Sequence, residues 1–204
     1  MSKNIKIAAG VLLIITVILA VIVIQPKRQL QNIQHIKADE LLPYLNDGDI
    51  ICRLSGRIWS LFIRDLSPAE KRFSHLGIVR IRNNAVTVIN AEGLQEGDDI
   101  VSEVSLEKFL EPALSAGIFR LHNIDTSLIS DTAMEFTGRP FDWKFDMDED
   151  EYIYCTELLY VVLKKLDPSI KLNTVWIKEF GRYILPLDIC SQSEYFTEIK
   201  YLGI

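Results

Sequence analysis

The sequence predicts an α+β domain of ordinary size, preceded by one membrane-spanning segment. Residues 7–24 form an uninterrupted run without a charge, and β-rich runs alternate with helically spaced apolar residues further along the chain. The length of 204 residues leaves room for one domain after such a segment. We expect a transmembrane anchor over residues 1–28, a connector with a short helix over 29–44, and an antiparallel sheet packed on helices over 45–204.

The apolar run predicts an anchor that is retained in the mature protein. Eighteen residues in a helix cover about 27 Å, close to the roughly 30 Å thickness of a bilayer's hydrocarbon core. The run ends in Val-Ile-Val-Ile-Gln-Pro-Lys-Arg, without the small residues of a signal-peptide cleavage site. We therefore expect a single-pass protein of the cell membrane. Basic residues flank the run on both sides and nearly cancel, so the positive-inside rule leaves the side of the domain open.

Charge and cysteine usage exclude several classes of function. The first 28 residues hold four basic residues and no acidic one, which leaves 18 basic against 28 acidic residues in the rest. So negative a domain repels phosphate backbones, and we expect no nucleic-acid partner. The three cysteines form no CxxC motif, so neither a disulfide scaffold nor a zinc finger is indicated. We expect no metal and no cofactor.

Local signals place the elements in order along the domain. Pro43 limits a short helix that opens at Asp39, and dense turn residues then precede an apolar strand. Ser67-Pro68 ends an amphipathic stretch and signals the start of a new helix. The remaining expected elements are a hairpin over 75–81 and 85–92, a helix over 105–111 capped by Ser105, a strand over 117–121, helices over 127–137 and 155–166, and a β-like tail over 195–202.

The hairpin brings polar side chains together on one face. A two-residue loop at Asn83 and Asn84 places Asn90 opposite Gly77 and Glu92 opposite His75. A slip of one residue would turn both polar groups to the other face. In this register, either Asn90 or Glu92 can hold the imidazole.

Cys155 is the candidate nucleophile because it lies at the start of a predicted helix. Unpaired backbone N–H groups and the positive end of the helix dipole favour a thiolate there. A free cysteine is more often a small buried hydrophobe, and this is how we interpret Cys52 and Cys190. Of the histidines, His35 lies in the connector and His122 at a strand end, so His75 is the candidate base.

At these residues the sequence resembles the YiiX/YebB-like cysteine hydrolases, which are circularly permuted relatives of the NlpC-type, papain-like peptidases. In the permuted group, which includes the lecithin:retinol acyltransferase relatives, the histidine precedes the cysteine, as it does here. The resemblance covers roughly residues 45–165. It rests on the ordered motifs Gly48-Asp49-Ile50-Ile51, Ser74-His75-Leu76-Gly77-Ile78-Val79, Ile89-Asn90-Ala91, Gly138-Arg139-Pro140-Phe141-Asp142 and Tyr154-Cys155-Thr156-Glu157-Leu158.

The resemblance implies a permuted papain-like domain with Cys155 as nucleophile, His75 as base and Asn90 as the third polar residue. The family more often has Glu or His at the third position, so Glu92 is an alternative. Thr156 departs from the usual Cys-Ser-Glu-Leu pattern but keeps the hydroxyl group. Around the cysteine, Tyr154, Thr156 and Glu157 are the residues expected at the oxyanion and substrate side.

The implied chemistry is cleavage of an amide bond through a thioester, with a peptide or another small acylated amine as substrate. Two other functions remain open at this point. A lipid acyltransferase or thioesterase would use the same cysteine and histidine and would suit a bilayer anchor. A non-catalytic binding module would keep the fold and present its groove to a partner. The oligomeric state is not indicated by the sequence.

Overall fold

The computed structural model describes residues 36–204, except 94–98, 123, 150, 193 and 204. The predicted membrane segment and His35 lie outside the described residues, so the anchor and the domain boundaries stay predictions. Within the described ranges, no helix combines the length and the apolar character that crossing a bilayer requires.

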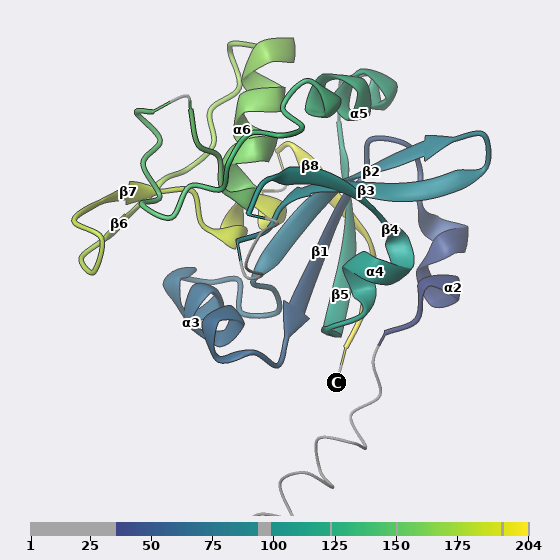
Figure 1. Ribbon diagram of the computed structural model, residues 1–204, viewed down its shortest axis with the longest axis horizontal. Helices are drawn as coiled ribbons and strands as arrows, with labels where there is room; N and C mark the ends of the chain where they lie inside the picture. Colours follow the sequence, from purple (N-terminus) through teal and green to yellow (C-terminus); the bar gives the residue numbers. More distant parts are fainter. Residues whose placement is uncertain (1–35, 94–98, 123, 150, 193, 204) are drawn as a thin grey trace, which may run out of the picture. The chain divides into compact units, whose positions relative to one another are not determined.

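Short helices are interspersed among the strands along the described chain, as Figure 1 shows. The helices of one turn or more are α2 (Ala38–Leu41), α3 (Ile58–Leu66), α4 (Leu106–Leu110), α5 (Thr126–Met134) and α6 (Cys155–Leu166), with 3-10 turns η1 (Leu42–Tyr44) and η2 (Leu187–Ser191). The strands are β1 (Ile50–Ser55), β2 (His75–Arg82), β3 (Ala85–Ala91), β4 (Val101–Ser105), β5 (Ala113–Leu121), β6 (Val175–Ile177), β7 (Arg182–Ile184) and β8 (Phe196–Leu202).

Six strands form one antiparallel sheet in the order β4-β3-β2-β1-β5-β8, and β6 pairs with β7 in a separate hairpin. The predicted hairpin register is confirmed, because Ile78 pairs with Ile89 and Arg82 with Ala85 around the two-residue loop. Asn83 and Asn84 have φ angles of 50° and 64°, the left-handed backbone that the tight turn requires. The predicted α+β class with an antiparallel sheet is therefore correct.

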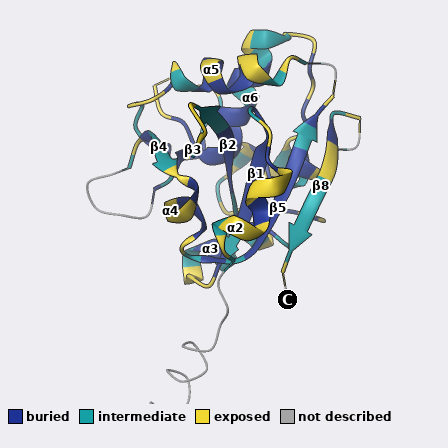
Figure 2. Ribbon diagram, turned by 90° about the vertical axis from the view of Figure 1, so that its right-hand side faces the viewer, coloured by how far each residue is buried: buried dark blue, intermediate teal, exposed yellow. Residues whose placement is uncertain are grey.

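Alternating side chains of the strands supply two apolar cores, one on each face of the sheet. Ile50, Cys52 and Ile78 belong to the core shared with α5 and α6, whereas Ile51 and Val79 belong to the core shared with α2 and α4. Figure 2 shows the inner strands as buried and the outer surfaces of α2 and α4 as exposed. Because the sheet is covered on both faces, its inner strands read as nearly continuous apolar runs.

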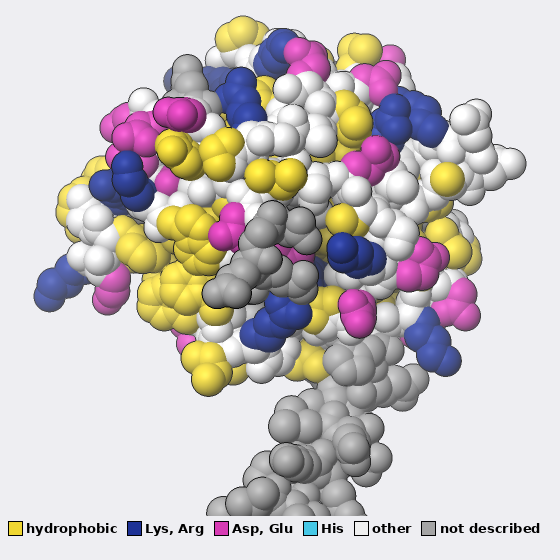
Figure 3. Space-filling view, viewed as in Figure 1, with side chains coloured by type: hydrophobic (Ala, Val, Ile, Leu, Met, Phe, Trp, Pro, Cys, Tyr) yellow, Lys and Arg dark blue, Asp and Glu magenta, His cyan; other side chains and the backbone are white. Residues whose placement is uncertain are grey.

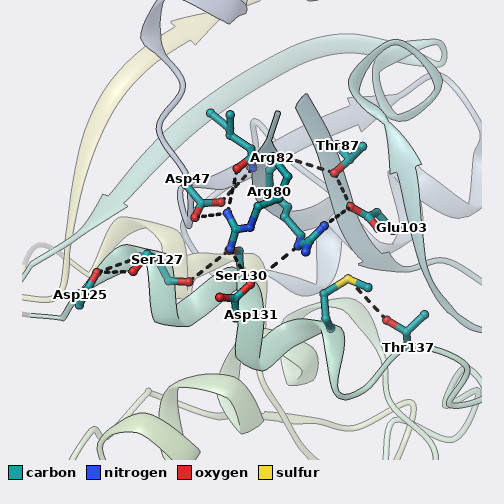
Figure 4. Close-up of polar contacts among 12 residues, drawn as sticks. Asp47, Arg80, Arg82, Thr87, Glu103, Asp125, Ser127, Ser130, Asp131 and Thr137 are labelled. Atoms are coloured by element: carbon teal, nitrogen blue, oxygen red, sulfur yellow. Dashed lines mark hydrogen bonds and ion pairs between the residues drawn. The ribbon is translucent and has the colours of Figure 1, made fainter. Parts of the chain in front are cut away.

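Two arginines near the turn of the hairpin, Arg80 and Arg82, form polar contacts with neighbouring elements (Figure 4). Arg82 donates to Asp47 Oδ2 at 2.7 Å and to Ser130 Oγ at 3.2 Å, and it forms an ion pair with Asp131. Arg80 forms an ion pair with Glu103 at 3.3 Å. These contacts join β2 to α5, to β4 and to the turn before β1, and so hold in place the hairpin that carries His75 and Asn90.

The helix expected after Ser67-Pro68 is not formed, so that prediction was wrong. Ser67 Oγ accepts a hydrogen bond from the N–H of Leu187 at 3.0 Å instead of capping a helix. The N–H groups of Ala69 and Glu70 both donate to Asp188 Oδ1. The residues that would begin a helix thus bind the distant segment at Leu187 and Asp188 instead. No pattern within residues 67–70 indicates these contacts.

Candidate active site

Cys155 is the first residue of α6, as the sequence predicts, and its side chain is buried with 7% of its surface exposed. The carboxylate of Glu157 accepts the N–H of Tyr154 at 3.2 Å, which satisfies a donor at the start of the helix. The backbone of Leu76 and of Thr156 acts to lower the pKa of the Cys155 thiol. The sulfur therefore sits where α6 begins, against the strand that carries His75.

His75 is the first residue of β2 and lies directly opposite Arg53 of β1. Its Nε2 atom is 3.0 Å from Oδ1 of Asn90, a buried residue of β3. Because a carboxamide oxygen can only accept, Nε2 carries the proton in this contact and Nδ1 keeps its lone pair. The ring also stacks on Phe109 of α4, with 5.6 Å between centroids. Both contacts fix the orientation of the imidazole.

Glu92 does not share the contact with His75 and pairs with Arg53 instead. The carboxylate Oε1 lies 2.5 Å from Nη2 of Arg53, whose side chain is only 3% exposed. The guanidinium also sits over the Phe109 ring, 4.8 Å from its centroid. Strand β3 ends at Ala91 and its pairing with β2 begins at Ile78 and Ile89, so Glu92 lies beyond the paired residues that would have placed it opposite His75.

Cys155 and His75 line the same pocket, which we call the Cys155 pocket. Its polar lining comes from the ends of β1, β2 and β3, and its apolar lining from α3 and the segment after Pro140. Lining residues include Arg53, Trp59, Ile63, Ser74, His75, Glu92, Phe141, Phe145 and Cys155. Hydrophobic side chains gather on the face over α3 in Figure 3. In α3, the ring of Trp59 stacks on that of Phe62 and approaches that of Trp143.

Burial holds both reactive groups in their neutral forms. It raises the pKa of Cys155 to about 11, against the opposing effects of the backbone hydrogen bonds and the Arg53 charge. Burial and the Arg53 charge lower the pKa of His75 to about 4, against the opposing charge of Glu92. The helix start favours thiolate, as the sequence argument expects, but desolvation outweighs it. At neutral pH the site holds a thiol and an unprotonated imidazole.

The three residues around Cys155 have other contacts of their own. The hydroxyl of Tyr154 accepts the N–H of Leu185 at 3.0 Å, and the hydroxyl of Thr156 donates to the carbonyl of Leu185 at 2.6 Å. Glu157 caps the helix as described above. Leu185 and Leu187 line an apolar pocket that also includes Cys155. Tyr154 and Thr156 thus hold Leu185 in place, and we call Leu185 and Leu187 the wall beside Cys155. The oxyanion role of Tyr154 and Thr156 stays a prediction.

Arg53 and Phe109 are site residues that the sequence argument did not single out. Arg53 interrupts the apolar stretch Ile50–Leu54, and a charge inside a buried strand is the signal that marks it. Phe109 lies on the predicted helix over 105–111, but its contact with His75 joins elements far apart in the chain. No local pattern points to that contact.

Comparison with known families now assigns the chain to a class of enzyme. Residues 44–189 match the family described as permuted papain-like amidase enzymes, YaeF/YiiX, C92 family. The chain therefore belongs to this family, and it is an enzyme of the papain-like cysteine amidase and peptidase class. The resemblance seen in the sequence is confirmed. No curated protein sequence matches the chain.

Among solved structures, the fold is similar to the metalloprotein yiiX from Escherichia coli O157:H7. The match has a TM-score of 0.66 at 17% identity and covers 79% of this chain and 99% of that one. At this identity the likeness concerns the fold. The description as a metalloprotein applies to the Escherichia coli protein. Among the residues described for this chain, no three His, Cys, Asp or Glu side chains gather in a way that could hold a metal ion.

Proposed function

We propose that this chain is a membrane-anchored cysteine amidase that cleaves an amide bond of a small acylated or peptide substrate through a thioester. Cys155 acts as the nucleophile, His75 as the base and Asn90 as the residue that orients the imidazole. The observation that carries the proposal is the hydrogen bond between His75 Nε2 and Asn90 Oδ1, on a histidine that lines the same pocket as Cys155.

The orientation of His75 supports its role as base. Nε2–H is engaged by Asn90, so Nδ1 is the nitrogen with a free lone pair for the proton of the thiol. The low pKa of His75 keeps that lone pair available at neutral pH. The hydrogen bond with Asn90 acts to raise the pKa of His75, but Asn90 places no negative charge beside the ring, as a carboxylate would.

The reaction then starts from a neutral pair. His75 takes the thiol proton as the Cys155 sulfur attacks the carbonyl carbon, and the oxyanion forms beside the backbone N–H groups at the start of α6. His75 returns the proton to the leaving amine, which departs and leaves a thioester on Cys155. Water, activated by the same imidazole, hydrolyses the thioester and releases the acid. Arg53, paired with Glu92, lines the pocket in which the oxyanion develops.

A lipid acyltransferase or thioesterase is the second candidate, favoured by the apolar pocket beside Cys155. The side chains that line that pocket are mostly apolar, as those in contact with an acyl chain would be; they include Ile63, Leu66, Phe145, Ile184, Leu185 and Leu187. The two candidates differ in what they accept. Muropeptides and lipid esters or thioesters offered in parallel separate them. The amidase releases an amine from the muropeptide, whereas a transferase or thioesterase takes the acyl group from the lipid and passes it to an acceptor or to water.

The membrane anchor over residues 7–24 belongs to the proposal and has its own test. The full chain should sediment with membranes and require detergent for release, whereas a variant that begins at residue 29 should stay in the supernatant. A full chain that is recovered without detergent would contradict the anchor and would leave the proposed chemistry untouched.

The proposed nucleophile is tested by trapping its acyl form. The full chain in detergent is treated with p-nitrophenyl acetate, quenched in acid and weighed by mass spectrometry, with the Cys155→Ala variant in parallel. We expect the mass of one acetyl group on the Cys155 peptide, removed by hydroxylamine at neutral pH and missing from the variant. Equal acetylation of wild type and variant would contradict the proposal.

A further inference from the structure

Two cysteines outside the proposed chemistry lie in contact beneath the site. Cys52 Sγ and Cys190 Sγ are 3.1 Å apart, although the residues are separated by 138 positions. Ordinary non-bonded carbon atoms pack at about 3.5–4.0 Å, and sulfur is larger than carbon. Both side chains are buried in the same apolar core. In the structure both are free thiols in hydrogen-bond contact, about 1 Å beyond the bonding distance of a disulfide.

The two cysteines belong to segments that form parts of the site. Cys52 is in β1, next to Arg53 of the Cys155 pocket, and pairs with Leu76 of β2. Cys190 is in η2, which begins at Leu187, a residue of the wall beside Cys155. A bond between the sulfur atoms would tie that wall to the centre of the sheet.

We propose that Cys52 and Cys190 form a disulfide that fastens the wall beside Cys155 to strand β1. A disulfide has sulfur atoms about 2.05 Å apart, so its closure requires a movement of about 1 Å. The burial of both thiols implies that the bond forms during folding, before the core closes around them. It goes beyond the proposed hydrolase chemistry, in which neither cysteine takes part.

The reaction is an exchange with a disulfide-containing oxidant, such as oxidised glutathione or a disulfide carrier protein. One cysteine loses its proton and attacks the oxidant's disulfide, which gives a mixed disulfide and releases one thiol of the oxidant. The second cysteine, as thiolate, displaces the remaining half. The two cysteines together lose two protons and two electrons, and the oxidant becomes two thiols.

Three features keep the wall in place without the bond, so the bond adds to an existing interface. Asp188 accepts the N–H groups of Ala69 and Glu70, and Ser191 donates to Glu70 at 2.8 Å. The N–H of Leu187 donates to Ser67. The reduced chain can therefore fold, and the effect of the bond is measurable as a difference between two folded forms.

The proposal is tested on the full chain, reduced and unfolded, then refolded in detergent with a mixture of oxidised and reduced glutathione. Free thiols are alkylated before a non-reducing digest and mass spectrometry. We expect a linked Cys52–Cys190 peptide and an alkylated Cys155. Recovery of Cys52 and Cys190 as separate alkylated peptides, or a link from either of them to Cys155, would overturn the proposal.

Two variants separate this bond from the chemistry of Cys155. Cys155→Ala should form the same linked peptide, and its thermal midpoint should rise by roughly 5–15 °C on oxidation. Cys190→Ala should show no dependence of its midpoint on oxidant. An equal response to oxidant in both variants would overturn the assignment, and it would leave the acylation test of Cys155 unaffected.

Discussion

The Nε2 atom of His75 and the Oδ1 atom of Asn90 are 3.0 Å apart across β2 and β3. Of the two candidates that the sequence leaves open, Asn90 is the one that contacts His75, whereas Glu92 is paired with Arg53. The contact with Asn90 also leaves Nδ1 of His75 as the nitrogen without the proton. The first four predictions below concern residues that place this pair or the wall beside Cys155.

Asn90→Ala should slow acylation by p-nitrophenyl acetate about 100-fold, because the imidazole loses the contact that fixes its tautomer and ring angle. Stopped-flow release of nitrophenolate measures the rate. The matched control is Thr197→Ala, which removes the hydroxyl partner of the exposed His122 and should leave the rate unchanged. An unchanged rate in Asn90→Ala would show that His75 needs no such orientation.

Glu92→Gln should destabilise the fold by about 1–3 kcal/mol, because the buried guanidinium of Arg53 loses its counter-charge. Urea unfolding gives the free energy of unfolding. The control is Glu103→Gln, whose partner Arg80 is 24% exposed, so that about 0–1 kcal/mol is expected. Equal losses in the two variants would contradict the special role of the buried pair.

Gly77→Ala should destabilise the hairpin by about 1–3 kcal/mol, because a Cβ at this position would lie 2.3 Å from Cγ1 of Val88 and 3.2 Å from Cβ of Asn90. Thermal or urea unfolding measures the loss. Gly56→Ala is the control, since its Cβ meets only a side-chain atom of Leu114 at 3.4 Å. A stability equal to that of the control would mean that β3 moves away from the added Cβ without loss of the free energy of unfolding.

Tyr154→Phe should cost about 1–3 kcal/mol, because the buried N–H of Leu185 loses its acceptor while the ring keeps its volume. Hydrogen exchange at the Leu185 amide should also speed up, which reports loosening of the wall directly. Tyr183→Phe, at a residue that is 60% exposed, serves as the control. Unaltered exchange at Leu185 would contradict the role of the hydroxyl.

The sequence predicted those parts of the fold whose signals are local. The Asn83-Asn84 turn fixed the hairpin register, Ser105 predicted the cap of α4, and the periodic residues after Cys155 predicted α6. Cys155, His75 and Asn90 followed from these elements and the family resemblance. Strands β4, β6 and β7 were not predicted, because they have only 5, 3 and 3 residues. Runs so short do not show a clear alternation of apolar and polar side chains.

The remaining features depend on contacts between distant segments. Ser67 accepts a hydrogen bond from Leu187 of η2, and Arg53 forms an ion pair with Glu92. Cys52 contacts Cys190, which lies 138 residues away. Each of these residues has an ordinary local interpretation: a helix cap, an interruption in a strand, and a buried hydrophobe. Only the packed structure shows the partner that gives each residue its role.

The most direct test of the account is the pH profile of Cys155 acylation in the wild type and in His75→Ala. The second-order rate with p-nitrophenyl acetate is measured from pH 4 to pH 11 and assigned to Cys155 by subtracting the Cys155→Ala background. With His75 as base, the rate needs the imidazole unprotonated and the thiol protonated. It should therefore rise through the His75 pKa of about 4 and stay level toward the Cys155 pKa of about 11.

Without the imidazole only the thiolate reacts, and its fraction grows about tenfold for each pH unit below the thiol pKa. His75→Ala should thus be slowest at low pH and approach the wild-type rate only near the pKa of the thiol. We expect this difference in slope if His75 is the base of Cys155. Parallel profiles in the two proteins would show that His75 is not the base of Cys155.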